Sequence, residues 1–471
     1  MQVSFAIADD PDRQRQIPAS WDLEQGNLLL MGIPGSGTST ALTSIALTIA
    51  NAMSPNDLDL VVLDMGSGDL APLADLPHTT GYVGSGSGSR EQQVRFLRYV
   101  RAEVDRRKAD PRGHRRTVVL IDGLATLREE FQDYEGIELM EGLYRAYTDG
   151  PELGLSFACS TTRAKAVPPA IDEVTTQKWL FRLADQYDYS AAGIRPNEAP
   201  AAVPGRCIVA GTRLQTHVAT PGAELDLAVA TVASRWTGSR RKPDVVGRLP
   251  EGVTVSEVGA TASVVGEPWL IPVGIREADL EPQYLELYEG EHLLIAGSAR
   301  SGKSTLLLAI AESLRGATHA AGPPVSVWGA CDRRSPLSGS PLLDRVAVVA
   351  DELPALMAGA RIHSGPLVIL IDDAERVDDA DQAISNLLSA GLSNIVVIAS
   401  GRADDLRTLY SHWTKAVRKS RCGVLLQPNV DYDGELLGVT LPRRAPVAIT
   451  PGRGYACVAG AVALVQTSAP S

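Results

Sequence analysis

Eight consecutive residues in the second half of the chain have the types and spacing that bind phosphate. They read Gly297-Ser298-Ala299-Arg300-Ser301-Gly302-Lys303-Ser304. In this pattern the glycines let backbone N–H groups close around phosphate oxygens, and the N-terminus of the following helix adds partial positive charge. Lys303 is expected to reach the β- and γ-phosphates, and the Ser304 hydroxyl to ligate Mg²⁺. We therefore predict that this loop, extended to Thr305, binds ATP with Mg²⁺.

A second copy of the pattern, near the N-terminus, lacks the lysine. It reads Gly32-Ile33-Pro34-Gly35-Ser36-Gly37-Thr38-Ser39 and is followed by Thr40. Thr38 takes the lysine position, and no local residue can supply its charge to a γ-phosphate. Two interpretations stay open: a relic that keeps the turn and binds nothing, or a site that holds nucleotide through the backbone and Ser39 but hydrolyses poorly. In the second interpretation the binding residues are Gly32, Gly35, Ser36, Gly37, Thr38, Ser39 and Thr40.

Each half also contains a strongly apolar run that ends in aspartate. Asp122 follows residues 117–121, and Asp372 follows residues 367–371. An aspartate at the end of the strand beside the P-loop strand holds the Mg²⁺ shell, while the P-loop hydroxyl provides another ligand. Ser304 and Asp372 are therefore the predicted metal ligands, acting through the bound nucleotide.

The residue after this aspartate is usually a glutamate that orients the attacking water. The chain has Asp373 in the second half and Gly123 in the first. An aspartate carboxylate falls about 1 Å short of the glutamate reach, which can cost on the order of 100-fold in rate. We name Lys303, Asp372 and Asp373 as candidate catalytic residues of a slow site. The first half, which lacks both groups, is expected not to hydrolyse ATP.

Small polar residues and an arginine end a later strand in each half. Ser400 and Arg402 do so in the second half, and Thr161 and Arg163 in the first. Such residues either sense the γ-phosphate or simply cap the strand, and the sequence alone does not choose between the two roles.

The P-loop and the strand-end aspartate can meet only if strands and helices bring them together. The two halves of the chain contain such elements in the same order, with an offset of roughly 250 residues. A strand precedes each P-loop and an apolar helix follows it. Each half ends with Pro-Gly-Arg, at 204–206 and 451–453, before a hairpin-like segment. Continuous apolar strands suit a parallel sheet covered on both faces. We predict a duplicated α/β protein with domains at residues 1–240 and 260–471.

Composition limits the classes of function. The net charge is −12, with 44 basic and 56 acidic residues, which disfavours nucleic acid as a partner. The strongest basic run, Arg106-Arg107-Lys108, is interpreted as a solvated helix end. Five scattered cysteines without metal-ligand spacing favour a reduced, cytoplasmic setting. With no signal peptide or membrane span expected, the chain could still be peripheral at a membrane through a partner.

Further short segments carry a resemblance to a known family. They are Asp9–Gln14, Leu63–Gly68 with Leu76-Pro77-His78, Ile271–Gly274 with Leu280-Glu281-Pro282, Leu436–Gly438 and Pro451–Gly454. Together with the P-loops, they make the chain resemble the FtsK/SpoIIIE class of hexameric ATPases. The resemblance is closest to the tandem C-terminal ATPase domains of EccC, from type VII (ESX) secretion.

The resemblance implies two tandem RecA-like P-loop NTPase domains, ATP and Mg²⁺ binding, and a role in exporting small WXG-type proteins. In that family the last domain, here 260–471, recognises a C-terminal signal peptide on the exported protein. The middle domain, here 1–240, is regulatory, and degenerate nucleotide sites are typical of both. The family's membrane anchor and first ATPase domain are not in this sequence. A membrane-anchored ATPase subunit or a missing N-terminal part is thus an expected partner, and a homo-hexamer is compatible with the class.

Two alternatives remain. An FtsK-type translocase would show ATPase activity stimulated by double-stranded DNA with steep salt dependence. A non-enzymatic scaffold would not bind nucleotide even at millimolar ATP.

Overall fold

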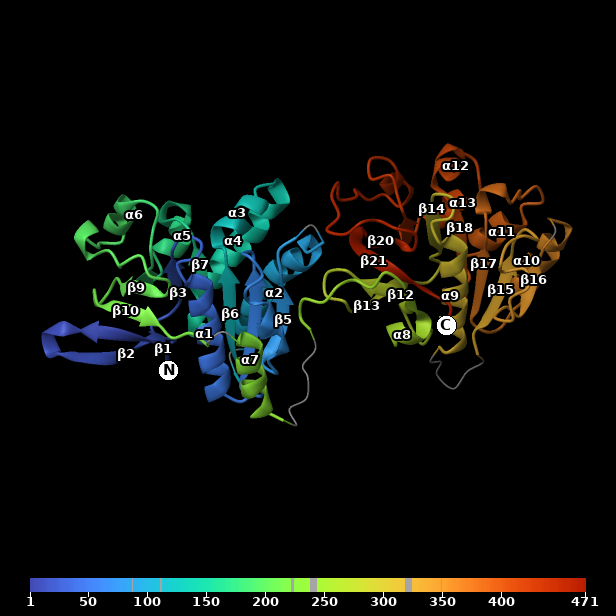
Figure 1. The fold of residues 1–471 in the computed structure, drawn as a ribbon. Coiled ribbons are helices and arrows are strands. Elements are labelled where there is room, and N and C mark those ends of the chain that lie inside the picture. The colour runs from blue at the N-terminus through green and yellow to red at the C-terminus, as the bar shows by residue number, and fades with distance from the viewer. Residues whose placement is uncertain (87, 111, 222–223, 238–243, 318–323, 349) are drawn as a thin grey trace. The chain divides into compact units, whose positions relative to one another are not determined.

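The computed structural model describes residues 1–471 apart from 87, 111, 222–223, 238–243, 318–323 and 349. The chain divides into two compact units, Met1–Gly247 and Arg248–Ser471, here called unit 1 and unit 2. Figure 1 colours unit 1 from blue to green and unit 2 from yellow-green to red. Each unit is a mostly parallel sheet flanked by helices, which confirms the predicted α/β class.

The sheet of unit 1 has the strand order β2-β1-β10-β9-β8-β3-β7-β6-β4-β5. Pairing is parallel from β8 to β5 and antiparallel from β2 to β8. The strands are β1 (Gln2–Asp10), β2 (Arg15–Asp22), β3 (Leu28–Met31), β4 (Leu58–Asp64), β5 (Thr79–Val83), β6 (Arg116–Asp122), β7 (Leu155–Thr161), β8 (Gln177–Leu180), β9 (Arg206–Val209) and β10 (Gln215–Val218). The helices are α1 (Thr38–Ala52), α2 (Arg90–Ala109), α3 (Leu124–Glu130), α4 (Tyr134–Asp149), α5 (Pro169–Asp172), α6 (Gln186–Ala191) and α7 (Leu225–Ser234).

Unit 2 repeats this order strand for strand, as β13-β12-β21-β20-β19-β14-β18-β17-β15-β16, with β11 added beside β21. The strands are β11 (Val253–Thr254), β12 (Trp269–Arg276), β13 (Pro282–Leu287), β14 (Leu293–Gly297), β15 (Ser326–Ala330), β16 (Arg345–Ala347), β17 (Leu367–Ile371), β18 (Ile395–Arg402), β19 (Gly423–Leu426), β20 (Arg453–Val458) and β21 (Ala461–Ala469). The helices are α8 (Val255–Val258), α9 (Lys303–Arg315), α10 (Leu353–Arg361), α11 (Ala383–Ser389), α12 (Ala403–Thr408) and α13 (Thr414–Arg418).

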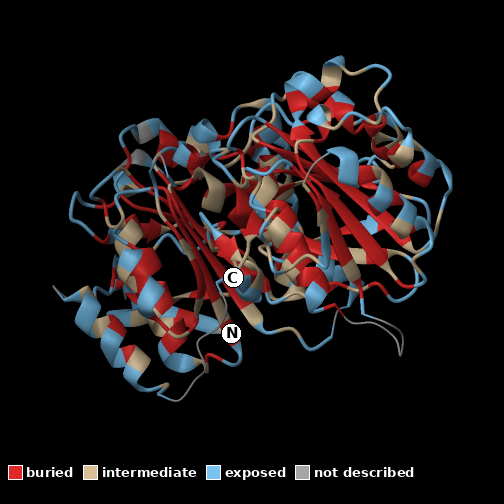
Figure 2. Cartoon of the chain, turned by 90° about the vertical axis from the view of Figure 1, so that its right-hand side faces the viewer, coloured by how far each residue is buried: buried red, intermediate tan, exposed pale blue. Residues whose placement is uncertain are grey.

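The central strands are buried on both faces, which is why they read as unbroken apolar runs. In β17, Leu367, Ile369 and Ile371 pack into one core cluster, and Val368 and Leu370 into the cluster on the other face. Strand β4 alternates between two clusters in the same way. Figure 2 shows these strands as continuous buried ribbons between helices whose outer faces are exposed.

This packing fixes where the candidate site lies. Because β3, β6 and β7 are parallel neighbours, the residues after their carboxyl ends meet at one edge of the sheet. The same holds for β14, β17 and β18 in unit 2. Across the described residues, no helix is both long and apolar enough to span a bilayer.

Candidate functional site

The P-loop of unit 2 connects β14 to α9, and its glycines hold its shape. Gly302 has a φ of +103°, which an L side chain rarely adopts. A Cβ on Gly297 would lie 2.4 Å from the Leu426 carbonyl oxygen. Arg300 is exposed at the top of the loop, while the Ser301 hydroxyl is buried and has no hydrogen-bond partner among the described residues. The loop thus offers backbone N–H groups and an unsatisfied hydroxyl, a set that fits a phosphate.

Lys303 is the first residue of α9 and is only 8% exposed. Its Nζ donates to the carbonyl oxygens of Ser298 (2.7 Å) and Gly297 (3.3 Å) in its own loop. Burial lowers the pKa of the amine, and the nearby carboxylates of Glu375, Asp373 and Asp372 oppose that shift. The lysine is therefore held at the loop, where an anion would compete for it.

Asp372 accepts hydrogen bonds from three hydroxyls at the carboxyl end of β17. Ser304 Oγ donates to both carboxylate oxygens at 2.9 and 3.1 Å. Ser335 donates at 2.6 Å and Ser400 at 2.5 Å. The hydroxyl and carboxylate predicted to ligate Mg²⁺ are therefore in direct contact, and hard oxygen donors of this kind suit that ion. A polar cavity of about 600 Å³ opens beside them.

Asp373 does not continue the extended conformation of β17. Its φ is +49°, in the left-handed region, and its carboxylate pairs with Arg376 at 3.8 Å. The equivalent Gly123 of unit 1 has a φ of +86°. Glycine adopts this conformation without strain, so the backbone itself gives a reason for Gly123 besides the loss of an acid.

Unit 1 keeps the metal-side half of the site and lacks the lysine. Ser39 Oγ donates to Asp122 at 2.7 Å, and Ser160 donates to the other oxygen of the same carboxylate. Burial raises the pKa of Asp122, although both hydroxyls oppose the shift. Gly37 has a φ of +104°, matching Gly302, and Thr38 is the buried first residue of α1. Thr40, like Thr305 in unit 2, lies in the first turn of its helix.

The strand register corrects the predicted pairing of the polar strand ends. In β7, Ser160 lies opposite Leu30, and in β18 Ser400 lies opposite Ile295, at matching places in the two sheets. Ser160, and not Thr161, is therefore the counterpart of Ser400. Arg163 consequently stands one residue beyond the counterpart of Arg402, and it lines a different pocket.

The two Pro-Gly-Arg turns are part of the site, a role that the sequence did not reveal. The Gly205 N–H donates to the Ser36 carbonyl oxygen at 2.8 Å, and the Gly452 N–H donates to that of Ser301 at 2.9 Å. A Cβ on Gly37 would lie 2.6 Å from the Gly205 nitrogen. Each turn therefore supports its P-loop from outside. The repetition of the tripeptide in both halves was the signal for a shared role.

Two further residues were missed. Ser335 reaches Asp372 from the loop after β15, and Glu375 lies in the 3-10 turn η7 (Ala374–Arg376). Ser335 carries no motif of its own. Glu375 could have been noticed as a third acidic residue, after Asp372 and Asp373, close to the end of β17.

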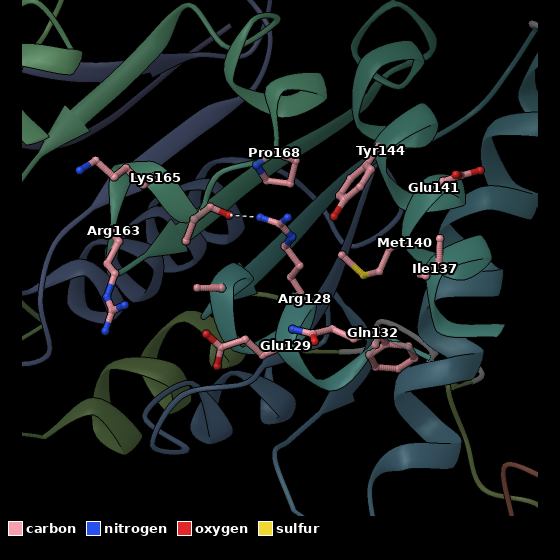
Figure 3. A pocket seen from close by; sticks show the side chains of 13 residues that line it. Arg128, Glu129, Gln132, Ile137, Met140, Glu141, Tyr144, Arg163, Lys165 and Pro168 are labelled. Atoms are coloured by element: carbon pink, nitrogen blue, oxygen red, sulfur yellow. Dashed lines mark hydrogen bonds between the residues drawn. The ribbon is translucent and has the colours of Figure 1, made fainter. Parts of the chain in front are cut away.

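Unit 1 also has a pocket of about 720 Å³ between α3, α4 and the segment after β7. Phe131, Ile137 and Met140 give it an apolar wall, and Arg128 and Lys165 add positive charge. Figure 3 shows the Arg128 side chain reaching across it, with its guanidinium donating to the Ala166 carbonyl oxygen at 3.3 Å. Ile137 is 51% exposed at its rim.

The sequence model of the FtsK/SpoIIIE family matches residues 4–220, and the duplicated sheets with their P-loops have the architecture of tandem P-loop ATPase domains. Among curated proteins, the chain is 28% identical to the ESX secretion system protein YukB of Bacillus subtilis, covering 66% of this chain and 22% of YukB. It is 25% identical to the ESX-4 secretion system protein EccC4 of Mycobacterium tuberculosis, covering 99% of this chain and 40% of EccC4. The chain thus spans less than two thirds of these relatives.

Solved structures show the same fold. ATPases 2 and 3 of EssC from Geobacillus thermodenitrificans align with a TM-score of 0.78 at 20% identity, over 100% of this chain and 96% of that one. ATPases 2 and 3 of Thermomonospora curvata EccC, in complex with a signal sequence peptide, align with a TM-score of 0.70 at 21% identity, over 100% and 93%. The predicted resemblance to FtsK/SpoIIIE ATPases and to the EccC tandem domains is confirmed, and this family implies nucleotide binding.

Proposed function

We propose that this chain is an ATP-binding module of a type VII (ESX) secretion motor, with ATP and Mg²⁺ bound in unit 2. The observation that carries the proposal is the contrast between the P-loops: Lys303 stands beside the Ser304–Asp372 contact, whereas Thr38 stands beside the Ser39–Asp122 contact. Lys303 would neutralise the terminal phosphates, and the loop N–H groups would orient them. Bound Mg²⁺ would offset charge on the phosphate oxygens, held through Ser304 and Asp372.

Unit 1, in this proposal, binds nucleotide weakly or not at all and acts as a regulatory domain. Unit 2 turns ATP over slowly in this proposal, because Asp373, which pairs with Arg376 at 3.8 Å, does not take the water-orienting role that a glutamate usually has at this position. A membrane-anchored ATPase, on a separate subunit or in a longer form of the chain, would supply the motor activity. Assembly into a hexamer follows from the class alone.

We further propose that unit 2 recognises the C-terminal signal peptide of exported WXG-type proteins. The support is the relationship to ESX secretion proteins and the solved EccC relative in complex with a signal sequence peptide.

The DNA-translocase alternative is disfavoured by how the basic run is used. Arg107 is buried and donates to Glu103 (2.7 Å) and to Thr117 Oγ1 (2.6 Å). Lys108 pairs with Asp149 at 2.6 Å. These cations are engaged within unit 1 and do not form a stripe for a phosphate backbone.

The proposal is tested by ATP binding and turnover of the purified chain. Lys303→Ala should weaken ATP binding by about 10- to 100-fold, because charge-assisted hydrogen bonds contribute about 1.5–3 kcal/mol. Thr38→Ala is the matched control and should leave the tight binding unchanged. Turnover should stay low and should not respond to double-stranded DNA. Brisk hydrolysis on adding DNA would reject the proposal in favour of the translocase, and no binding at millimolar ATP would favour the scaffold.

A further inference from the structure

One carboxylate near the proposed ATP site, that of Glu375, has no role in the site as described above. Glu375 follows Asp373 by two positions, and its Oε2 accepts a hydrogen bond from the Arg402 backbone N–H at 3.2 Å. Its Oε1 is buried and has no hydrogen-bond partner among the described residues. Buried acceptors are rarely left unsatisfied, so an orphan oxygen at a binding site indicates a missing partner.

The Glu375 carboxylate occupies the space that a side chain at the end of β18 would fill. A Cβ on Gly401 would lie 2.6 Å from Glu375 Oε2. Position 401 therefore has to be glycine for Glu375 to take up this place. The carboxylate consequently lies at the same sheet edge as Asp372 and the P-loop.

Charge also connects Glu375 to the proposed phosphate position. Of the carboxylates that favour the charged form of Lys303, Glu375 has the largest effect, ahead of Asp373 and Asp372. Lys303 is the group expected to contact the γ-phosphate. Burial raises the pKa of Glu375, and the charges of Asp373 and Asp405 raise it further.

Unit 1 lacks this acid altogether. Counting from the strand-end aspartate, the counterpart of Glu375 is Ala125, which lines the apolar pocket. The unit that has lost the P-loop lysine has therefore also no carboxylate at this position.

We propose that Glu375, and not Asp373, holds the attacking water in unit 2. The inference rests on the proposed binding of ATP there. The water oxygen bonds to the γ-phosphorus as the bond to the β–γ bridging oxygen breaks, giving ADP and inorganic phosphate. Glu375 accepts the water proton through Oε1 and returns it to solvent. Asp373, strained and paired with Arg376, keeps the turn in place.

The test compares Glu375→Gln with Asp373→Asn in the full chain. Affinity is measured with a fluorescent ATP analogue, and turnover by phosphate release. General-base catalysis typically contributes 10²–10⁴-fold, so Glu375→Gln should lower turnover by about 100-fold while the Kd for ATP stays within about threefold. Asp373→Asn should change turnover by less than about threefold.

The outcomes separate this inference from the proposal on which it rests. ATP binding with equal turnover in wild type and Glu375→Gln overturns the role of Glu375 alone. The same holds if Asp373→Asn abolishes turnover, or if wild-type turnover is no faster than that of Lys303→Ala. Absence of ATP binding by the wild-type chain overturns both.

Discussion

At the scale of single residues, the two P-loops differ at four of their eight positions, and one of these differences removes the lysine. Lys303 and Thr38 are both the first residue of the helix after the loop, and both are buried. Below them, the serine–aspartate contact is present in each unit. If unit 1 binds nucleotide less tightly than unit 2, as we propose, the missing lysine charge should account for most of the difference in affinity.

We expect Thr38→Lys to give unit 1 a nucleotide site. The change is best made with Lys303→Ala, so that binding by unit 1 is observed alone. Affinity for ATP should rise by about 10- to 100-fold over the Lys303→Ala protein, for the same reason that Lys303 is needed in unit 2. Isothermal titration calorimetry measures the change.

Thr38→Met, of similar length without the charge, serves as the control. If the Thr38→Lys protein binds no better than this control, the loop of unit 1 is closed to phosphate for another reason, and the one-charge explanation is wrong.

At the scale of elements, the sequence was sufficient to locate site residues that lie within one segment. It did not locate those that different strands and loops bring together. The P-loops and the strand-end aspartates were predictable because residue type and spacing within one segment define them. Ser335 was not, since it reaches Asp372 from the loop after another strand. The predicted correspondence between Arg163 and Arg402 was wrong by one residue, because only the strand register shows which residues lie opposite each other.

The contact between the Pro-Gly-Arg turn and the P-loop of unit 1 leaves no room for a side chain at Gly37. Gly37→Ala should destabilise unit 1 by about 2–4 kcal/mol, because the positive φ strains an alanine and the added Cβ lies 2.6 Å from the Gly205 nitrogen. Urea unfolding of the variant, compared with wild type, measures this cost.

The matched control is Gly211→Ala, at an exposed position where an added Cβ meets nothing within 4 Å. It should change the free energy of unfolding by less than about 0.5 kcal/mol. Equal effects of the two alanines would show that the turn does not support the P-loop.

At the scale of the whole molecule, the same strand order occurs in both units, but only unit 2 has the P-loop lysine. The order of the sheets could be predicted only in outline, because periodicity shows that strands are buried but not which strands are neighbours. The resemblance implied a RecA-like fold without giving the strand order, and solved structures have the same fold at 20% and 21% identity. The placement of the apolar pocket in unit 1 was not foreseen.

Placing peptide recognition in unit 2 gives a prediction for that pocket. A labelled peptide from the C-terminus of a WXG-type protein should bind the full chain, and Ile137→Asp at the pocket rim should not change its Kd by more than about twofold. Fluorescence anisotropy measures both affinities. Ile137 is half exposed, so the aspartate should be tolerated by the fold. A loss of binding would move recognition to unit 1.

The turns that support the P-loops come late in each unit, since Gly205 stands about 170 positions after its loop and Gly452 about 150 after its own. During translation, each P-loop therefore leaves the ribosome long before the Pro-Gly-Arg turn that supports it. We therefore expect each P-loop to reach its final conformation only once the hairpin that follows its turn has emerged and joined the sheet.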